Sequence, residues 1–401
     1  MLDLYEPDNY VAGPPHKLFA ELRRTQPVYF QEMANEPGYW MVLKHADVVH
    51  VAREATLFSA SEGGVMLENL EQSQLEMMRN MLLAMDPPRH VDYRRPVEPR
   101  FRARVIAKME DQIRDICREI MAQAAEQGDV EFVHDVTSTL PSRVIGRLMG
   151  LPEEDLPQIH RWAEQSTSSQ DSDYAAEAAE GSIGMAMYAI QFAAERRTQP
   201  PQEDLTTLLL ETDFNGSFMT DIDFGSFFVQ LVTAGNDTTK TMLSSGLLAL
   251  LEHPEQMNDV RANPQYIASA IEEILRYDNP LHYFRRTATE DTVLHDVEIK
   301  AGDKVAMIYT SANRDEDVFT DPQTFDMRRH PNPHLSFGIA EHFCLGVHLA
   351  RLEGVVFFQE LFATFPTIEI TGEPRRTRSN LNNSLKALPV RLSTERPARA
   401  R

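Results

Sequence analysis

Apolar residues recur three and four positions apart along most of this chain, which is the spacing of one face of an α-helix. On that pattern we expect helices near residues 15–25, 88–126, 139–149, 152–166, 173–197, 217–252, 264–277 and 346–363. Alternation typical of strands is confined to residues 28–30, 39–43, 286–299, 304–309 and 387–392, with a turn at 301–303. By pattern alone, long helices with small β-sheets at one edge would form an α+β fold.

One stretch interrupts the helical patterns without the character of a linker between domains. Residues 199–204 read Gln-Pro-Pro-Gln-Glu-Asp, and the two prolines end any helix there. We therefore expect residues 1–401 to form a single domain, although this length exceeds the common domain size. Residues 395–401 are charged and carry no apolar anchor, so we expect a disordered tail.

Composition and charge narrow the class of protein. Hydrophobic residues make up 42% of the chain, which is enough for a sizeable core. No apolar run reaches the ~18 residues that a membrane span requires, and residues 1–7 lack the layout of a signal peptide. We expect a cytoplasmic protein without a membrane anchor. The net charge of −22 argues against nucleic-acid binding, because phosphate contacts need a basic face.

The chain has two cysteines, and their surroundings differ. Cys117 lies among isoleucines at helical spacing, which predicts a core thiol and no disulfide. Cys344 lies in a glycine-bracketed segment, residues 337–346, just ahead of a helical run. A sulfur at a helix N-terminus meets unpaired N–H groups and the positive end of the helix dipole, which favour the thiolate. A buried free thiol is the alternative interpretation of Cys344.

Residues 337–346 have the spacing Phe-Gly-x-x-x-His-x-Cys-x-Gly. This segment resembles the cysteine-ligand signature of the cytochrome P-450 family, the haem-thiolate monooxygenases. The resemblance implies a triangular, mostly helical domain with a long central helix over haem b (iron protoporphyrin IX). It also implies that Cys344 binds the iron and that Phe337, Gly338 and Gly346 border the cofactor.

A second match lies inside the predicted helix 217–252, where residues 234–239 read Ala-Gly-Asn-Asp-Thr-Thr. Glycine and short polar residues are weak choices for a helix interior, and a kink with solvated side chains is the alternative interpretation. The family carries an acid followed by an alcohol at this place, which Asp237 and Thr238 match. The resemblance implies that this pair delivers protons for O–O cleavage and that Ala234 and Gly235 lie against the cofactor.

Haem brings two propionates, and buried carboxylates need hydrogen-bond donors. His90 and Arg94 are four residues apart and share one helix face, as in the family pattern that holds propionates. The resemblance adds Arg286 and His342 to this set. For each of these side chains an exposed charge is the alternative interpretation.

Glu273 and Arg276 match the Glu-x-x-Arg pair of the family. Any helix can place such a pair at its surface, where it contributes only ~0.2–0.5 kcal/mol. The resemblance implies a structural role, in which the pair locks the loop that carries Cys344.

Residues 94–104 are locally basic in a very acidic chain. They form either a solvated helix face or a docking patch for an acidic electron donor such as a ferredoxin. The Gly-x-Gly-x-x-Gly motif is absent, so electrons must come from separate partners, a ferredoxin and its NAD(P)H-dependent reductase.

By position, the candidates for the substrate pocket are Met85, Leu231, Leu281, Tyr283 and Phe284, although a methionine can equally be core filler. Residues 285–289 and 311–361 are similar to relatives that act on steroids, fatty acyl chains and monoterpenoids. The resulting hypothesis is an oxidoreductase that uses O2 to hydroxylate a terpenoid or steroid-like molecule. A peroxide-driven fatty-acid peroxygenase and a non-catalytic haem-thiolate sensor of ligands or gases are the alternatives. The acid–alcohol pair argues against the peroxygenase, because peroxide already supplies both oxygen atoms.

Overall fold

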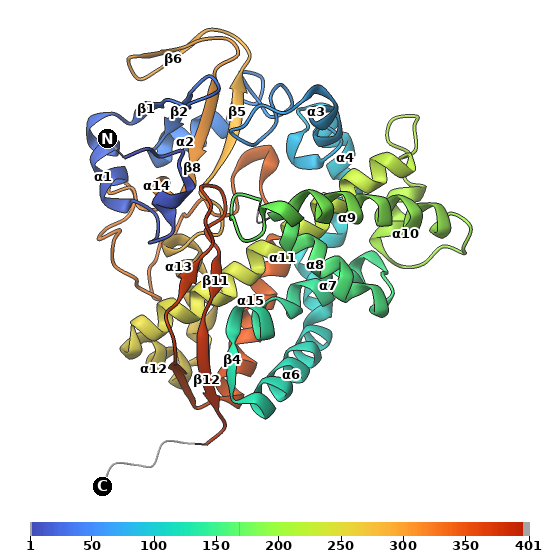
Figure 1. The fold of residues 1–401 in the computed structure, drawn as a ribbon, viewed down its shortest axis with the longest axis vertical. Helices are drawn as coiled ribbons and strands as arrows, with labels where there is room; N and C mark the ends of the chain where they lie inside the picture. Colours follow the sequence, from blue (N-terminus) through green and yellow to red (C-terminus); the bar gives the residue numbers. More distant parts are fainter. Residues whose placement is uncertain (1, 168, 396–401) are drawn as a thin grey trace.

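A long helix, α11 (Asp221–Glu252), crosses the middle of the molecule (Figure 1). The computed structural model describes residues 2–167 and 169–395. Around α11 lie α6 (Glu110–Gln127), α7 (Thr139–Met149), α8 (Leu156–Thr167), α9 (Ala175–Arg196), α13 (Ile267–Tyr277) and α15 (Val347–Thr364). The remaining helices are α1 (His16–Thr25), α2 (His45–Arg53), α3 (Gln72–Met78), α4 (Arg89–Val97), α5 (Ala103–Ile106), α10 (Leu205–Glu211), α12 (Pro254–Ala262) and α14 (Tyr309–Ala312).

The N-terminus of α11 is fixed by a reciprocal cap. Thr220 Oγ1 accepts a hydrogen bond from the backbone N–H of Asp223, and the Asp223 carboxylate accepts one from the Thr220 N–H, both at 3.1 Å. The helix is buried along most of its C-terminal half, from Thr239 to Leu250. A helix buried on nearly all sides is the core of a large domain.

The largest sheet has the strand order β1-β2-β8-β5-β3 and lies on one side of the helical body (Figure 1). Its strands are β1 (Val28–Gln31), β2 (Tyr39–Val42), β3 (Phe58–Ser59), β5 (Tyr283–Ala288) and β8 (Lys304–Ile308). β5 pairs antiparallel with β8, with Arg286 opposite Val305. Because side chains alternate along a strand, this register decides which β5 residues face the site.

Three smaller sheets complete the fold. They contain β4-β12-β9, β6-β7 and β10-β11. The strands are β4 (Asp129–Glu131), β6 (Thr292–Leu294), β7 (Val297–Ile299), β9 (Thr367–Ile370), β10 (Arg375–Arg376), β11 (Leu385–Ala387) and β12 (Pro389–Ser393). The mainly helical fold with small sheets that the sequence predicts is therefore confirmed.

One helix prediction was wrong in its continuity. The expected helix 88–126 is divided into α4, a 3-10 turn (Glu98–Phe101), α5, a second 3-10 turn (Ala107–Met109) and α6. α4 includes Pro96 but ends one residue later at Val97, and Pro99 lies in the first 3-10 turn. Each proline lacks an N–H donor and clashes with the preceding turn, which favours ending the helix here.

Cys117 is completely buried in α6 and free, as predicted. The predicted tail 395–401 falls, except for Glu395, outside the described residues. Across the two described ranges, none of the helices is long and apolar enough to cross a bilayer.

Candidate active site

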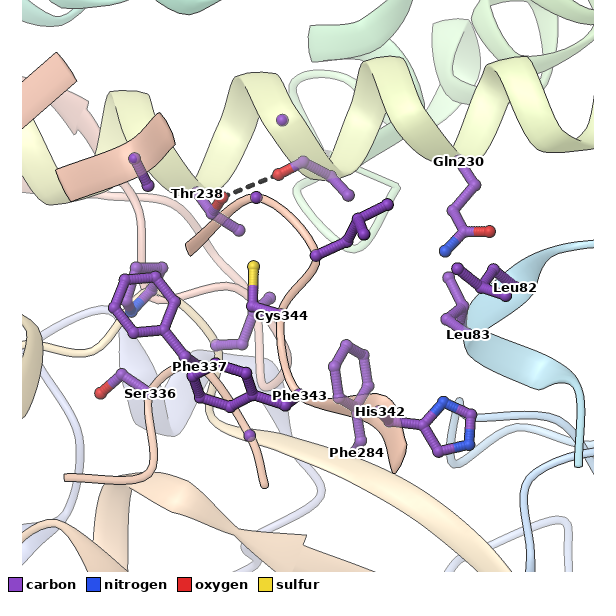
Figure 2. Close-up of a pocket in the computed structure, with 18 of the residues that line it drawn as sticks. Leu82, Leu83, Gln230, Thr238, Phe284, Ser336, Phe337, His342, Phe343 and Cys344 are labelled. Carbon is purple, nitrogen blue, oxygen red and sulfur yellow. Dashed lines mark hydrogen bonds between the residues drawn. The ribbon is translucent and has the colours of Figure 1, made fainter. Parts of the chain in front are cut away.

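A cavity of about 250 Å³ lies between α11 and the segment that carries Cys344. Figure 2 shows α11 above this space, with the Cys344 sulfur directed toward the part of the helix that carries Thr238. Both strong sequence motifs therefore meet at one place, although 106 positions separate Thr238 from Cys344 in the chain.

The backbone around Cys344 is a tight loop that ends at the N-terminus of α15. The Cys344 N–H donates to the carbonyl oxygen of Phe337 at 2.8 Å, which closes the loop. Gly338 has φ +66, a left-handed conformation that favours glycine. Gly346 is the N-cap of α15, and its backbone N–H is directed at the Cys344 sulfur. The glycines of the motif thus shape the loop that presents the thiol.

In the protein without a bound metal, the helix terminus stabilises the Cys344 thiolate less than burial destabilises it. Burial raises the pKa of the Cys344 thiol, while the Gly346 N–H and the charges of Arg94 and Arg351 act in the opposite direction. Desolvation is the larger effect because protein atoms surround the sulfur. A bound metal ion would supply the missing positive charge, since a coordinating thiol is deprotonated outright.

The Glu273–Arg276 pair locks the segment leading to this loop. Both side chains have 0% exposure, and the guanidinium binds the carboxylate at 2.7 and 2.8 Å. Arg276 also donates to three backbone carbonyls, those of Asn313, Pro322 and Thr324. The ion pair is therefore a buried crosslink between α13 and the chain that runs toward Cys344.

A second link holds the start of the cysteine loop itself. Ser336 donates to the carbonyl oxygen of Leu275 on α13 at 2.6 Å, and Asn313 donates to Ser336 at 2.8 Å. The Arg351 guanidinium lies 4.9 Å from the centre of the Phe337 ring, in a cation–π contact. These contacts fix the loop from α13 and α15 together.

The four predicted propionate ligands line the same cavity. The rings of His90 and His342 lie 4.4 Å apart, and Arg94 donates to the backbone carbonyl of Glu341 at 3.2 Å. Arg286, 5% exposed, reaches the cavity from β5.

Several of these groups lack a hydrogen-bond partner among the residues that the structure describes. Within that part of the chain, both ring nitrogens of His90 and Nε2 of His342 are buried and unpaired. Burial, reinforced by Arg94 and Arg286, lowers the pKa of His90 to about 4, and burial with the same arginines lowers that of His342 to about 2. Buried polar groups in native proteins find partners, so this cluster fits an anionic ligand. Two carboxylates beside a sulfur-ligated metal match the cluster, and the residues present therefore fit haem.

On α11, Ala234, Gly235 and Thr238 line the cavity. Thr238 donates its hydroxyl to the carbonyl oxygen of Ala234 at 2.7 Å, and Figure 2 shows this bond. The helix is continuous through Gly235, whose added Cβ would make only ordinary contact with Ile145. The conformational freedom of glycine is therefore not required here by the protein's own packing.

Asp237 is not among the residues that line the cavity. Successive helix residues are about 100° apart, so the neighbour of a cavity-facing threonine points elsewhere. Its carboxylate is bound to Lys240 at 2.9 Å and accepts a hydrogen bond from Ser384 at 3.2 Å. The predicted acid–alcohol pair is adjacent in sequence, but in this structure Thr238 lines the cavity whereas Asp237 is bound to Lys240 and Ser384.

Lys240 connects Asp237 to a network that reaches the surface. Its ammonium lies 3.4 Å from Glu164, which lies 3.6 Å from the half-exposed imidazole of His134. Burial opposes the charge of Glu164, but the hydrogen bond from His134 and the charge of Lys240 prevail and lower its pKa to about 2. The network stays charged, which holds Lys240 and Asp237 in place.

The predicted substrate-pocket residues divide into two groups. Leu231, Leu281 and Phe284 line the cavity. Met85 and Tyr283 do not line it and are packed in hydrophobic cores, at 1% and 2% exposure. Tyr283 and Phe284 are neighbours on β5, and alternation along the strand allows only one of them to face the site.

Sequence reasoning missed several residues of the site. Leu82, Leu83, Gln230 and Glu353 also line the cavity. Gln230 was open to detection, because it is the one polar residue in the otherwise apolar run 227–232. The leucines carried no signal, since an apolar residue in a short turn looks like any other core position.

Three comparisons place this geometry among known proteins. The family model described as cytochrome P-450 matches residues 169–392. A steroid C26-monooxygenase from Rhodococcus jostii is 36% identical, over 98% of this chain and 85% of the relative. A methyl-branched lipid omega-hydroxylase from Mycobacterium tuberculosis is 36% identical, over 93% of this chain and 90% of the relative.

Among solved structures, a Mycobacterium marinum cytochrome P-450 in complex with pseudoionone superposes with a TM-score of 0.89. It is 35% identical and covers 95% of this chain and 96% of its own. The likeness extends over nearly the whole chain.

Proposed function

The chain belongs to the cytochrome P-450 family and is a haem-dependent monooxygenase that hydroxylates a hydrophobic molecule; on that premise we propose a steroid-like or methyl-branched isoprenoid substrate. The observation that supports this choice is the cavity wall opposite Cys344, which is built largely from aliphatic and aromatic side chains. The relatives named for steroid and methyl-branched lipid oxidation favour the same class. An apolar pocket with few polar groups selects such molecules by excluding water.

Cys344 would hold the haem iron, and His90, Arg94, Arg286 and His342 would hold the propionates. When bound, haem supplies an iron at which dioxygen is activated, with the thiolate favouring O–O cleavage. The tasks left to this chain's own side chains are to fix the cofactor, exclude water and move protons.

For proton delivery we infer that Thr238 is the last donor, because its hydroxyl faces the cavity. Asp237 would resupply it. Because Lys240 holds the carboxylate at 2.9 Å, transfer requires either a bridging water or a rotation that breaks this ion pair. The chain His134–Glu164–Lys240 stabilises the resting position of Asp237.

We further infer that an acidic ferredoxin delivers the two electrons at the basic segment 94–104. Arg95, Arg100, Arg102 and Arg104 are exposed there, while Arg94 of the same segment lines the cavity. Opposite charge would guide the encounter and make the rate of reduction fall as salt screens it. Reduction rates that do not change with ionic strength would contradict this docking site.

The test is turnover of the holoenzyme with a surrogate ferredoxin, its reductase and NADPH. A panel of a steroid, a methyl-branched fatty acid and an isoprenoid ketone should give at least one product with one added oxygen, formed in proportion to NADPH consumed. Product formed with hydrogen peroxide alone at a comparable rate would favour the peroxygenase. Binding of these ligands without product under either regime would favour the sensor.

A further inference from the structure

One polar side chain in the cavity has no task in the arrangement described above. Gln230 lies on α11 and lines the cavity, and Figure 2 shows its amide projecting from the helix toward Leu82 and Leu83. Its Oε1 is buried and has no hydrogen-bond partner within residues 2–167 and 169–395. A buried amide oxygen without a donor costs free energy, so its retention in an apolar wall indicates a ligand.

Most of the other polar residues of the cavity already have a role or a partner; Thr239, for example, is hydrogen-bonded to Glu353. His90, Arg94, Arg286 and His342 form the basic cluster, Thr238 bonds Ala234, and Ser336 bonds Leu275. Gln230 stands apart from these because the side chains opposite its amide are leucines. A polar group bound there belongs to the substrate and not to the cofactor.

The position of Gln230 along α11 indicates where the polar group lies in the substrate. Gln230 precedes Thr238 by eight residues, which is about 12 Å along the axis at 1.5 Å per residue. Thr238 lies on the part of α11 toward which the Cys344 sulfur points. A substrate oxidised at that place therefore presents atoms about 12 Å away to Gln230.

We propose that Gln230 is a specificity-determining residue that binds a hydroxyl group of the substrate about 12 Å from the carbon that is oxidised. An amide donates through Nε2 and accepts through Oε1, and rotation of its last side-chain bond exchanges the two. A hydroxyl can both accept and donate, so it satisfies either orientation. This inference rests on the proposed function, and it narrows the substrate class to a hydrophobic alcohol.

The test compares two ligands that differ only in the hydroxyl. Suitable probes are the thirteen-carbon secondary alcohol 6,10-dimethylundeca-5,9-dien-2-ol and the hydrocarbon of the same skeleton. Nine bonds separate its hydroxyl carbon from the branched end, a length comparable to the ~12 Å that the helix sets at 1.5 Å per residue. Dissociation constants are measured from the change that each ligand causes in the haem absorption band of the holoenzyme.

The preference is the dissociation constant of the hydrocarbon divided by that of the alcohol. This ratio should be about five- to ten-fold larger in the wild type than in Gln230→Met. Methionine keeps the length of the side chain and removes both polar atoms. Leu83→Ala serves as the matched control, because it removes an apolar contact beside the amide and should weaken both ligands by a similar factor. Equal preferences in wild type and Gln230→Met, or an equal change in Leu83→Ala, would overturn the proposal.

The same ligands separate this inference from the proposed function. A preference that depends on Gln230, without any hydroxylated product from either ligand, would support the amide's role and contradict the monooxygenase reaction on this class. Hydroxylation of both ligands, with binding that does not depend on Gln230, would support the monooxygenase reaction and contradict the role of the amide.

Discussion

Replacing Arg276 with methionine tests whether the buried pair beneath the cysteine loop holds the site together. The guanidinium makes five hydrogen bonds of 2.7–3.0 Å, two to Glu273 and three to backbone carbonyls. Methionine fills much of the volume but donates none of them. The Glu273 carboxylate would keep Arg329 at 3.2 Å and Asn332 at 3.1 Å, so its charge would be only partly compensated.

The expected loss follows from removing one partner of a buried ion pair, which costs about 3–5 kcal/mol. A domain has about 5–15 kcal/mol of stability in total, so the loss is a large fraction of it. The neighbouring pair Glu272–Arg351 provides the scale for comparison. Arg351 is 37% exposed, and breaking its pair in Arg351→Met should cost about 1 kcal/mol.

Urea unfolding of both holoenzyme variants, followed by circular dichroism and by the haem absorption band, measures these losses. Arg276→Met should unfold at a much lower urea concentration than Arg351→Met, and it should release haem earlier in the transition. Similar losses of stability in the two variants would refute the claim that burial makes the Glu273–Arg276 pair the stronger crosslink.

Three further predictions concern single residues. Cys344→Ser should abolish the strongly red-shifted absorption band of the reduced protein with carbon monoxide, and a variant that keeps the band would remove Cys344 as the iron ligand. Thr238→Ala should still bind substrate but divert electrons from product to free hydrogen peroxide; unchanged coupling of NADPH to product would exclude Thr238 from proton delivery. Burial raises the pKa of Glu353 to about 8 from 4.5, so the wild type loses stability as pH rises between these values. The stability of Glu353→Gln relative to wild type should therefore grow by about 1.4 kcal/mol per pH unit over that range, and a constant difference would show that Glu353 is ionised in the fold.

The long helices could be predicted from the sequence because their apolar periodicity extends over many turns. The expected ranges 139–149 and 217–252 correspond to α7 and to α11 within a few residues. The short helices α2, α3, α10 and α12 were not predicted, since seven to nine residues carry too little periodicity to stand out. Their formation depends on packing against elements distant in the chain.

The residues of the site also fall into two groups, those that the sequence could identify and those that it could not. Residues within one local motif, such as Cys344 and Gly338, could be assigned because a fixed spacing identifies them. Met85 and Tyr283 were wrongly placed in the cavity wall because their assignment depended on which side of a turn or strand they occupy. Gln230 was missed although it lies close to the strongest motif of α11, because an amide acquires meaning only when its surroundings are known to be apolar.

The position of Asp237 shows how the protein separates charge from an apolar cavity. Four basic groups gather on the side where the cofactor's carboxylates would lie, and the substrate side is neutral. A free carboxylate facing that neutral wall would lose its hydration without gaining a partner. Lys240 prevents this by binding Asp237 behind the helix, and Glu164 and His134 keep Lys240 there. The uncharged hydroxyl of Thr238 can face the cavity at little cost, because it is already bonded to Ala234. The acid can therefore be stored beside the site and still leave the pocket able to bind an apolar substrate.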